Sequence, residues 1–398
     1  MAFNQQINAC KFYRGIFPRY GFYYLQTLRP WLYAVASATT LPIVNKARFE
    51  LAPFPVAPAP EQHRIVAKIE ELLTKLDAGV EALHKVKAQL KRYRQTVLKS
   101  AFEGKLTEHW REAHMGEMEP AYALLERIRE ERKNNAGGKY KELPPIDTSN
   151  LPALPDEWMW TRVGEVIEMM QYGTSEKAGK DLLGVPVLRM GNIQDGKIKF
   201  ADLKFFPKDW PQTNEFLLQD GDLLFNRTNS AELVGKTTVY KEFHPKAVFA
   251  SYLIRLRLNK NAYDPDILSF FINSFYGRRY IASVVSQQVG QANVNGTKLS
   301  LMPIPLSPLY EQHKVRAEIE HQFSITDEVE KVVEQSLKQG ERLRQSILKK
   351  AFEGKLVPHD PSDEPADKLL ERIQEERAKL RLNQKTAKSK NTKQLRLI

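Results

Sequence analysis

Two long stretches of the chain, residues 57–106 and 307–356, carry apolar residues at seven-residue intervals. In each stretch a second row lies four positions away from the first, and this row is more polar in the later stretch. Apolar positions with this spacing fall on one stripe of an α-helix and are typical of helices that pair with another helix. The residues that we predict at the core of this helix pair are Ile69, Leu76, Leu83, Leu90, Val97, Ile319, Val333 and Ile347.

The two helical stretches belong to a long internal repeat. Residues 51–106 and 301–356 are identical at 23 of 56 positions, with a constant offset of 250 and no gap. The match resumes as LLERIREER at 124–132 and LLERIQEER at 369–377. A period this long is not that of a solenoid, whose units span roughly 20–50 residues. The chain therefore holds two copies of a domain followed by a helix. Because only residues 1–56 precede the first helix, we expect the front of the first copy to be missing.

Each long helix has a recognisable start. Ser307 and Pro308 fit an N-cap followed by proline at the first helical position, and Pro58 and Pro60 mark the corresponding point of the first copy. Neither helix can bury its apolar stripe alone, so we expect the two copies to pair within the chain. A two-fold relation between the copies would make this pair antiparallel. Homodimerisation, or packing inside a helix bundle, stays open as the alternative use of the stripe.

The segment between the helices predicts a mixed domain. Short apolar runs separated by Gly, Asn and Asp turns predict strands within residues 185–193, 197–206, 222–228, 235–241 and 251–258. Residues 154–170 predict turns and a short helix, and residues 267–286 predict one amphipathic helix. We expect an α+β fold with a small curved or barrel-like β-sheet. The predicted segments of the chain are 1–56, 57–106, 107–150, 151–306, 307–356 and 357–398.

Polar residues gather in four clusters near the ends of the predicted strands, within residues 171–174, 189–192, 226–230 and 291–295. Asn, Gln and Arg side chains form paired hydrogen bonds with base edges, whereas Arg, Lys, Ser and Thr contact phosphates. Such residues in loops are more often ordinary turn residues, but four clusters in one domain favour a DNA interface. The candidate DNA-binding residues are Arg189, Asn192, Asn226, Arg227, Thr228, Asn229, Ser230, Lys236, Gln291, Asn293, Asn295 and Lys298.

The composition agrees with a nucleic-acid partner. Lys and Arg number 60 against 48 Asp and Glu, which gives a formal net charge of +12 at pH 7. This balance favours double-stranded DNA as the partner, although good solubility alone would also explain it. The single cysteine, Cys10, excludes an intramolecular disulfide framework and a multi-cysteine zinc site. No apolar run is long enough to span a membrane, so we expect a cytoplasmic protein without a membrane partner.

Several motifs carry a resemblance that covers nearly the whole chain. They are PFPVAPAPEQHRIVAKIE, PIPLSPLYEQHKVRAEIE, the two AFEGKL helix ends, LRMGNIQDGKI and GDLLFNRTNSAELVGKT. The chain resembles the specificity subunits of bacterial type I restriction–modification enzymes, the HsdS family. The resemblance implies target-recognition domains that each read half of a split DNA site, joined by two antiparallel coiled-coil helices that measure the unread spacer. The missing front would belong to the first of these domains.

The same resemblance implies the partners and the site. The helix pair would bind two methyltransferase (modification) subunits, and nuclease–translocase (restriction) subunits would join for cleavage. It implies no cofactor and no metal in this chain, with S-adenosylmethionine, ATP and Mg²⁺ held by the partner subunits. It also implies that the loop at 226–230, Lys236 and the turn at 191–192 are the best candidates for DNA contact.

Three enzymatic interpretations are weaker, and we predict no catalytic residue. SAELVGKT at 230–237 has Ser in place of the first glycine of a phosphate-binding loop, and no helix is predicted after it. Pro155-Asp156 with Asp202 and Lys204 resembles a metal-dependent nuclease only faintly. The histidines of the two EQH motifs recur in the repeat, but their place at helix starts favours capping or docking over metal binding.

We therefore predict a non-catalytic, DNA-reading subunit of a type I restriction–modification complex. The alternative is a truncated, non-reading interaction module that binds methyltransferase subunits. The tail from Arg377 to Ile398 holds eight Lys or Arg and no acid. Either it contacts the DNA backbone or it is an ordinary solvated end.

Overall fold

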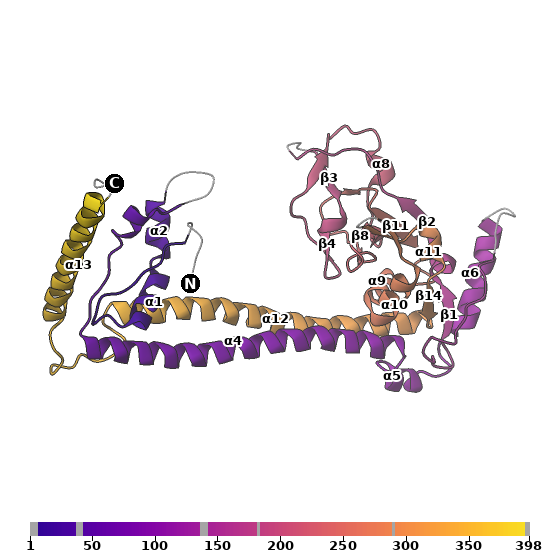
Figure 1. Ribbon diagram of the computed structural model, residues 1–398. Helices are drawn as coiled ribbons and strands as arrows, with labels where there is room; N and C mark the ends of the chain where they lie inside the picture. The colour runs from indigo at the N-terminus through magenta and orange to yellow at the C-terminus, as the bar shows by residue number, and fades with distance from the viewer. Residues whose placement is uncertain (1–6, 37–42, 136–141, 181–183, 289–290, 395–398) are drawn as a thin grey trace. The chain divides into compact units, whose positions relative to one another are not determined.

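The computed structural model describes residues 7–36, 43–135, 142–180, 184–288 and 291–394 (Figure 1). Parts of the predicted domain remnant, the 107–150 segment and the basic tail therefore lie outside the described residues. The chain forms two compact units. We call residues 1–88 and 330–398 the terminal unit, and residues 89–329 the central unit.

The small sheets and long helices confirm the predicted α+β class. The helical elements are α1 (Pro18–Thr27), α2 (Arg29–Val35), α3 (Lys46–Phe49), α4 (Ala59–Phe102), α5 (Glu108–Ala113), α6 (Ala121–Asn135), α7 (Val163–Val166), η1 (Met190–Asn192), α8 (Thr213–Phe216), α9 (Pro265–Asn273), α10 (Phe275–Val284), α11 (Gly296–Ser300), α12 (Leu309–Phe352) and α13 (Ala366–Gln394). The strands are β1 (Met159–Arg162), β2 (Ile167–Tyr172), β3 (Val185–Leu188), β4 (Ile193–Gln194), β5 (Lys197–Ile198), β6 (Lys204–Phe206), β7 (Leu223–Asn226), β8 (Thr228–Asn229), β9 (Thr237–Val239), β10 (Val248–Phe249), β11 (Leu253–Leu258), β12 (Ser286–Gln288), β13 (Gln291–Asn293) and β14 (Pro303–Leu306).

The long helices α4 and α12 pair in antiparallel fashion within the terminal unit. Arg344 of α12 forms an ion pair with Asp77 of α4, and Lys87 lies 2.8 Å from Glu334. As the residue numbers on α4 rise from 77 to 87, those of their partners on α12 fall from 344 to 334, so the two helices run in opposite directions. A Cβ on Gly340 would lie 3.3 Å from a methyl carbon of Val80, so a glycine allows the two helices to approach closely at this point.

The same two helices pair with the same polarity within the central unit. Nη2 of Arg94 lies 2.5 Å from a carboxylate oxygen of Asp327, and Nε of Arg94 donates to Oγ1 of Thr326 at 3.0 Å. The hydroxyl of Tyr93 donates to Gln322 at 2.8 Å. The predicted antiparallel pairing of the two copies is confirmed, since it is present in each unit.

The two Arg–Asp pairs are equivalent in the repeat. Arg94 and Arg344 are 250 positions apart, and so are Asp77 and Asp327. Each arginine thus reaches the aspartate of the other copy, as a two-fold relation between the helices requires. Among the predicted core residues, Ile69, Val97, Ile319, Val333 and Ile347 are buried, while Leu76, Leu83 and Leu90 are half-buried.

A glutamine near the start of each long helix makes the same contacts in both copies. Oε1 of Gln62 accepts from the backbone N–H of Phe17 at 2.8 Å, and Oε1 of Gln312 accepts from that of Asp264 at 2.9 Å. Each side-chain amide also donates to two backbone carbonyls. Phe17 and Asp264 each precede the proline that begins α1 or α9. Helix α1 therefore takes in the terminal unit the place that α9 takes in the central unit.

Both long helices also end in the same way. Gly104 and Gly354 have φ of +71° each, the left-handed conformation that glycine adopts without steric cost. The next residue donates its N–H back to the carbonyl five residues earlier, at 2.9 Å in both copies. The repeated FEGKL sequence thus encodes a helix stop.

The central unit is built on small, mostly antiparallel sheets. The largest has the strand order β2-β11-β7-β9, with every neighbouring pair antiparallel. A second has the order β10-β3-β6, in which β10 and β3 are parallel. A third has the order β12-β13-β8, and β1 with β14 and β4 with β5 form two-stranded ribbons.

The central strands of the largest sheet are buried on both faces. Leu223 and Phe225 of β7 and Ile254 of β11 belong to one core, which includes α9, α10 and the start of α12. Leu224 and Leu253, which point the other way, belong to a second core with β3, β6 and β10. Since alternate side chains of a strand face opposite sides, both faces of this sheet are anchored. The loop after β7 therefore starts from a rigid strand.

The structure corrects two local predictions. The single helix predicted over residues 267–286 is two helices, α9 and α10, because Ser274 adopts an extended conformation between them and caps α10. A Cβ on Gly277 would lie 2.4 Å from the carbonyl oxygen of Phe271, so α10 begins tightly against the end of α9. Over residues 154–170 the predicted short helix, α7, is present, but strands β1 and β2 flank it.

Candidate nucleic-acid interface

Two of the predicted DNA-binding clusters meet in the three-stranded sheet β12-β13-β8. Asn293 of β13 lies opposite Thr228 of β8, and Ala292 lies opposite Asn229. The side-chain amide of Asn293 donates to Oγ1 of Thr228 at 2.8 Å. Residues more than 60 positions apart in the sequence thus form one polar surface. Gln291, at the start of β13, is exposed at its edge.

Arg227 occupies the link between β7 and β8, and its backbone is held from two sides. Its N–H donates to the carbonyl of Tyr252 at 3.0 Å, and its carbonyl accepts from the N–H of Val294 at 2.9 Å. Its guanidinium carbon lies 4.7 Å from the ring centroid of Tyr172. One terminal nitrogen donates to the carbonyl of Ser251 at the long distance of 3.5 Å.

Tyr172 in turn is hydrogen-bonded to the segment between β13 and α11. The N–H of Gly296 donates to the Tyr172 hydroxyl oxygen at 2.8 Å. A Cβ on Gly296 would lie 3.1 Å from that oxygen and 2.5 Å from the sulfur of Met170, so a larger residue would displace the Met170 side chain. Asn295 caps the following helix α11, accepting from the N–H of Lys298 at 2.9 Å.

A buried ionic network supports the sheet behind Tyr172. Asp222 is fully buried and lies 2.8 Å from Arg257, with Arg255 at 3.6 Å. Burial lowers the pKa of the Arg255 guanidinium, and the negative charge of Asp222 opposes that shift. Arg255 also donates to the side-chain oxygen of Gln171, next to Tyr172. Buried charges are tolerated where they are paired and hydrogen-bonded, as these are.

The turn at residues 189–192 is held together by its own side chains. Asn192 is 3% exposed, and its amide donates to the carbonyls of Lys199 and Ala201 at 2.8 and 2.9 Å. Its carbonyl oxygen accepts from the N–H of Arg189. A terminal nitrogen of Arg189 donates to the carbonyl of Asp202 at 2.5 Å. In this structure Asn192 therefore shapes the turn, and we do not retain it among the proposed base contacts.

Asn226 is also placed inside the protein. Its side chain is fully buried, and its amide donates to the carbonyl of Met190 at 3.4 Å, which connects the 189–192 turn to the end of β7. Its side-chain oxygen has no partner among the residues that the structure describes. A base edge cannot reach a fully buried amide in this conformation, so Asn226 joins Asn192 as a positioning residue.

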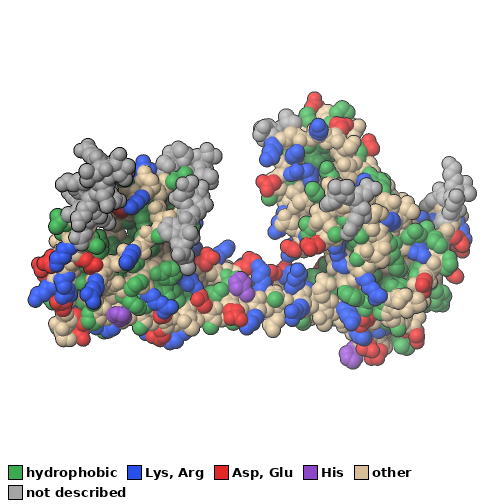
Figure 2. Space-filling view, in the orientation of Figure 1, with side chains coloured by type: hydrophobic (Ala, Val, Ile, Leu, Met, Phe, Trp, Pro, Cys, Tyr) green, Lys and Arg blue, Asp and Glu red, His purple; other side chains and the backbone are tan. Residues whose placement is uncertain are grey.

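The remaining predicted residues lie at the surface or close to it. Ser230 is exposed and begins the turn that returns the chain to β9. Lys236 and Asn229 are half-buried, and Lys298 reaches Oγ of Ser286 at 2.6 Å. On the face that Figure 2 shows, Lys and Arg side chains gather on the part of the central unit where β3 and β4 lie.

The structure brings together the clusters at 226–230 and 291–298 and joins the 189–192 turn to them through Asn226. Tyr172 lies in the polar cluster at 171–174 but is not among the residues that the sequence nominates for DNA contact. The signal that identifies it is tertiary, namely its contact with Arg227.

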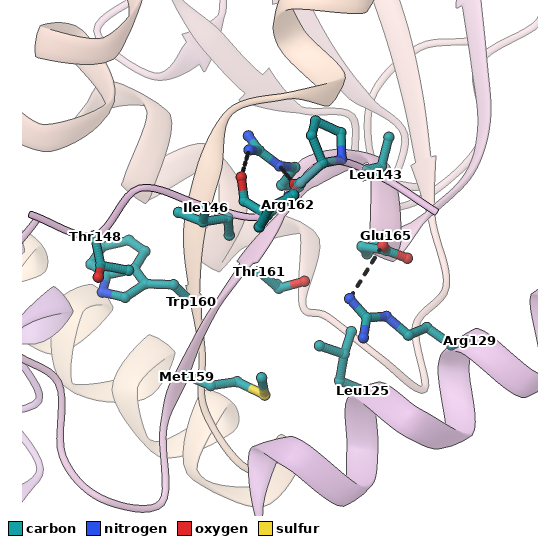
Figure 3. Close-up of a pocket in the computed structure, with 12 residues that line it drawn as sticks. Leu125, Arg129, Leu143, Ile146, Thr148, Met159, Trp160, Thr161, Arg162 and Glu165 are labelled. Atoms are coloured by element: carbon teal, nitrogen blue, oxygen red, sulfur yellow. Dashed lines mark hydrogen bonds and ion pairs between the residues drawn. The ribbon is translucent and has the colours of Figure 1, made fainter. Parts of the chain in front are cut away.

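A cavity of about 300 Å³ lies elsewhere in the central unit, between α6, β1 and residues 143–148 (Figure 3). Arg162 donates to the carbonyls of Pro144 and Pro145 at 2.8 and 2.7 Å, so it fixes this segment against β1. Arg129 lies 3.6 Å from the buried carboxylate of Glu165. No predicted DNA-binding residue lines the cavity.

The described residues hold neither a cluster of metal ligands nor a membrane-spanning helix. No group of three or more His, Cys, Asp or Glu in that part of the chain could hold a metal ion. None of its helices combines the length and the apolar character needed to cross a membrane.

Comparison with known proteins identifies the family. The family model of the type I restriction modification DNA specificity domain matches residues 1–92 and 155–339. The chain therefore belongs to the family of type I restriction–modification specificity proteins. The match covers both long helices in part and residues 155–329 of the central unit.

Individual relatives have the same designation. The chain is 30% identical over 345 residues to the EcoKI specificity subunit of Escherichia coli K12, covering 84% of this chain and 66% of that protein. It is 28% identical over 344 residues to the StySPI specificity subunit of Salmonella potsdam, again covering 84% of this chain and 66% of the relative. The chain thus spans slightly less than two thirds of the length of these relatives.

A solved structure supports the fold. The structure described as "Structural basis underlying complex assembly and conformational transition of the type I R-M system" contains a chain similar to this one with a TM-score of 0.60. Their sequences are 20% identical, and the match covers 85% of this chain and 71% of the other. At this level of identity the similarity supports the fold.

Proposed function

We propose that this chain is the DNA-recognition subunit of a type I restriction–modification complex and has no catalytic activity of its own. The central unit reads one half of a bipartite site in double-stranded DNA. The observation that carries the proposal is the meeting of residues 227–230 and 291–295 on one polar surface that is anchored to a rigid sheet. Membership of the specificity family supports it.

The proposal extends to partners and cofactors. We propose that the paired helices offer the docking surface for two methyltransferase subunits, and that nuclease–translocase subunits join them. S-adenosylmethionine, ATP and Mg²⁺ then belong to those subunits, and this chain holds none of them. We place the complex in the bacterial cytoplasm, where its DNA substrate is found.

DNA binding tests the proposal directly. The DNA would be duplexes that carry a site first selected from randomised sequences. Fluorescence anisotropy would measure how tightly they bind the full chain with its modification subunits. The variant Arg227→Ala/Lys236→Ala should weaken binding at least about tenfold. The slope of log K against log salt should also become shallower by up to about 2, because each phosphate contact contributes about 0.9.

A matched control removes the same charge elsewhere. Lys46→Ala/Lys368→Ala also removes two positive charges, but from exposed positions of α3 and α13. It should bind DNA as the unmodified chain does, and size-exclusion chromatography should show that both variants still bind the modification subunits. An equal loss of DNA affinity in both variants would show that the loss comes from the lower net charge and not from the interface. If the unmodified complex binds all duplexes equally, the chain is a non-reading interaction module.

A further inference from the structure

We propose that Arg227 recognises a guanine in the DNA half-site and that Tyr172 is the positioning residue that orients its guanidinium. This inference rests on the proposed function, which assigns DNA reading to the central unit. It goes further in naming the base, the side chain that contacts it and the side chain that holds that contact in place.

The first support is that Arg227 has no ion-pair partner within the described residues, unlike the arginines near it. Arg255 and Arg257, on the neighbouring strand β11, lie within 3.6 and 2.8 Å of the Asp222 carboxylate. For Arg227, no ion pair is found within the described part of the chain. Arg227 is half-buried, so part of its side chain is open to solvent. An arginine whose charge is compensated by no carboxylate, next to others that are compensated, is available to an external acceptor.

The second support is the fixed orientation of the guanidinium. The contact with the Tyr172 ring, at 4.7 Å from its centroid, restrains the group on one side, and the carbonyl of Ser251 engages one terminal nitrogen. The backbone hydrogen bonds to Tyr252 and Val294 fix the Cα from which the side chain starts. The other terminal nitrogen is left to form hydrogen bonds, so the site presents a preorganised donor edge.

A planar donor edge selects guanine among the groups that DNA offers. In the major groove guanine presents two adjacent acceptors, O6 and N7, which match the arginine fork, whereas adenine presents one acceptor and one donor. The fork also fits a phosphate, but the backbone presents the same acceptors at every step and a contact with it needs no single orientation. The fixed orientation of the guanidinium on the Tyr172 ring therefore favours base reading over backbone contact.

Tyr172 also links the arginine to the loop after β13. Its hydroxyl oxygen accepts from the N–H of Gly296, and that glycine follows the polar cluster at 291–295. Replacing Tyr172 by Phe keeps the ring under Arg227 and removes only the hydroxyl. Replacing it by Leu removes the ring. The two variants therefore separate the aromatic support from the loop contact.

Selection from duplexes with a randomised half-site tests the inference, using the full chain with its modification subunits. The unmodified chain should select a guanine at one or more positions. Arg227→Lys keeps the charge and loses the fork, so preference for guanine should fall at least about fivefold at one position and stay unchanged at the others. Tyr172→Leu should weaken the preference at that same position, and Tyr172→Phe should retain it.

Chemical modification of the base gives an independent measurement. Replacing the selected guanine by 7-deazaguanine removes the N7 acceptor, so binding of the unmodified chain should weaken, and it should weaken more than binding of Arg227→Lys, which lacks the fork. If Arg227→Lys lowers affinity equally for all duplexes, Arg227 contacts phosphate and the inference fails, although the proposed function stands. If Tyr172→Leu leaves the guanine preference intact, the positioning role is wrong. If the unmodified chain selects no sequence at all, both proposals are refuted.

Discussion

The buried carboxylate at the start of α12 offers the sharpest test of how the central unit is held together. Glu311 is fully buried and accepts three hydrogen bonds. They come from Nη1 of Arg111 at 2.8 Å, Oγ1 of Thr107 at 2.7 Å and Nε1 of Trp158 at 2.7 Å. These donors come from the segment after α4 and from the residue just before β1. Glu311→Ala would leave the buried Arg111 with only its longer ion pair, 3.9 Å from Glu157.

The expected cost follows from the burial of both groups. The side chains of Arg111 and Glu311 are 9% and 0% exposed, so solvent screens the pair little. Removing one partner of a buried ion pair typically costs about 3–5 kcal/mol. Glu61, the equivalent residue of the first copy, makes a weaker contact, since its carboxylate lies 3.8 Å from His359. Glu61→Ala should therefore cost about 1 kcal/mol or less.

Hydrogen–deuterium exchange with mass spectrometry is the appropriate assay, because it reports local opening without assuming that the whole chain unfolds in one step. Peptides covering α5 and the end of α4 should exchange faster in Glu311→Ala, and the corresponding peptides of the terminal unit should change little in Glu61→Ala. The double variant Arg111→Met/Glu311→Leu should recover the part of the protection that the unpaired Arg111 charge removes, but not the part due to Thr107 and Trp158, which still lack their acceptor. Equal effects of the two single variants would refute this reasoning.

Three further outcomes are expected. Burial raises the pKa of Asp327, but the hydrogen bond and charge of Lys197 lower it below the usual value. The stability that this pair gives the folded state is therefore present above about pH 4 and is lost as the pH falls through the folded pKa. Because the carboxylate is partly exposed, Asp327→Asn should lower the free energy of unfolding by under about 1 kcal/mol. The protection factors of the β4–β5 hairpin, which are corrected for the intrinsic exchange rate, should then no longer fall as the pH drops through the folded pKa of Asp327. Gln312→Leu leaves a buried backbone N–H unpaired and should lower the free energy of unfolding by about 1–3 kcal/mol. Gln312→Glu should cost at least as much, since its buried carboxylate would face the carbonyls of Ala262 and Ser307. Gly354→Ala should lower the free energy of unfolding by about 1 kcal/mol because of backbone strain. Gly104→Ala should lower it more, because a proline ring would lie 2.3 Å from the added Cβ. Equal losses in the two variants would contradict this expectation.

The helix pair was the part of the fold most open to prediction. Helical periodicity, proline at the start and glycine at the end act within a few residues of one another, so they can be recognised without knowing the rest of the fold. Helices α4 and α12 lie where the apolar rows predicted them. The antiparallel pairing followed from the repeat, because two equivalent copies in one chain favour a two-fold arrangement.

The sequence could not place every candidate site residue at the surface, and two asparagines show why. Asn192 and Asn226 have the composition expected of base-reading loops, yet both are buried. An amide side chain serves equally well to bind a base edge or to satisfy backbone carbonyls, and the choice depends on which carbonyls come near it. The break at Ser274 is similar, since the apolar periodicity of α9 and α10 continues across it.

The sequence by itself determined the repeat, the two long helices with their ends, and the family to which the motifs belong, because each of these depends on local spacing or on direct residue identity. The tertiary structure decided which polar residues face outward and which face inward. It also placed Tyr172 against Arg227, two residues 55 positions apart in the chain. That contact arises from strand pairing and loop geometry, which depend on many distant residues at once, and no short stretch of sequence contains this information.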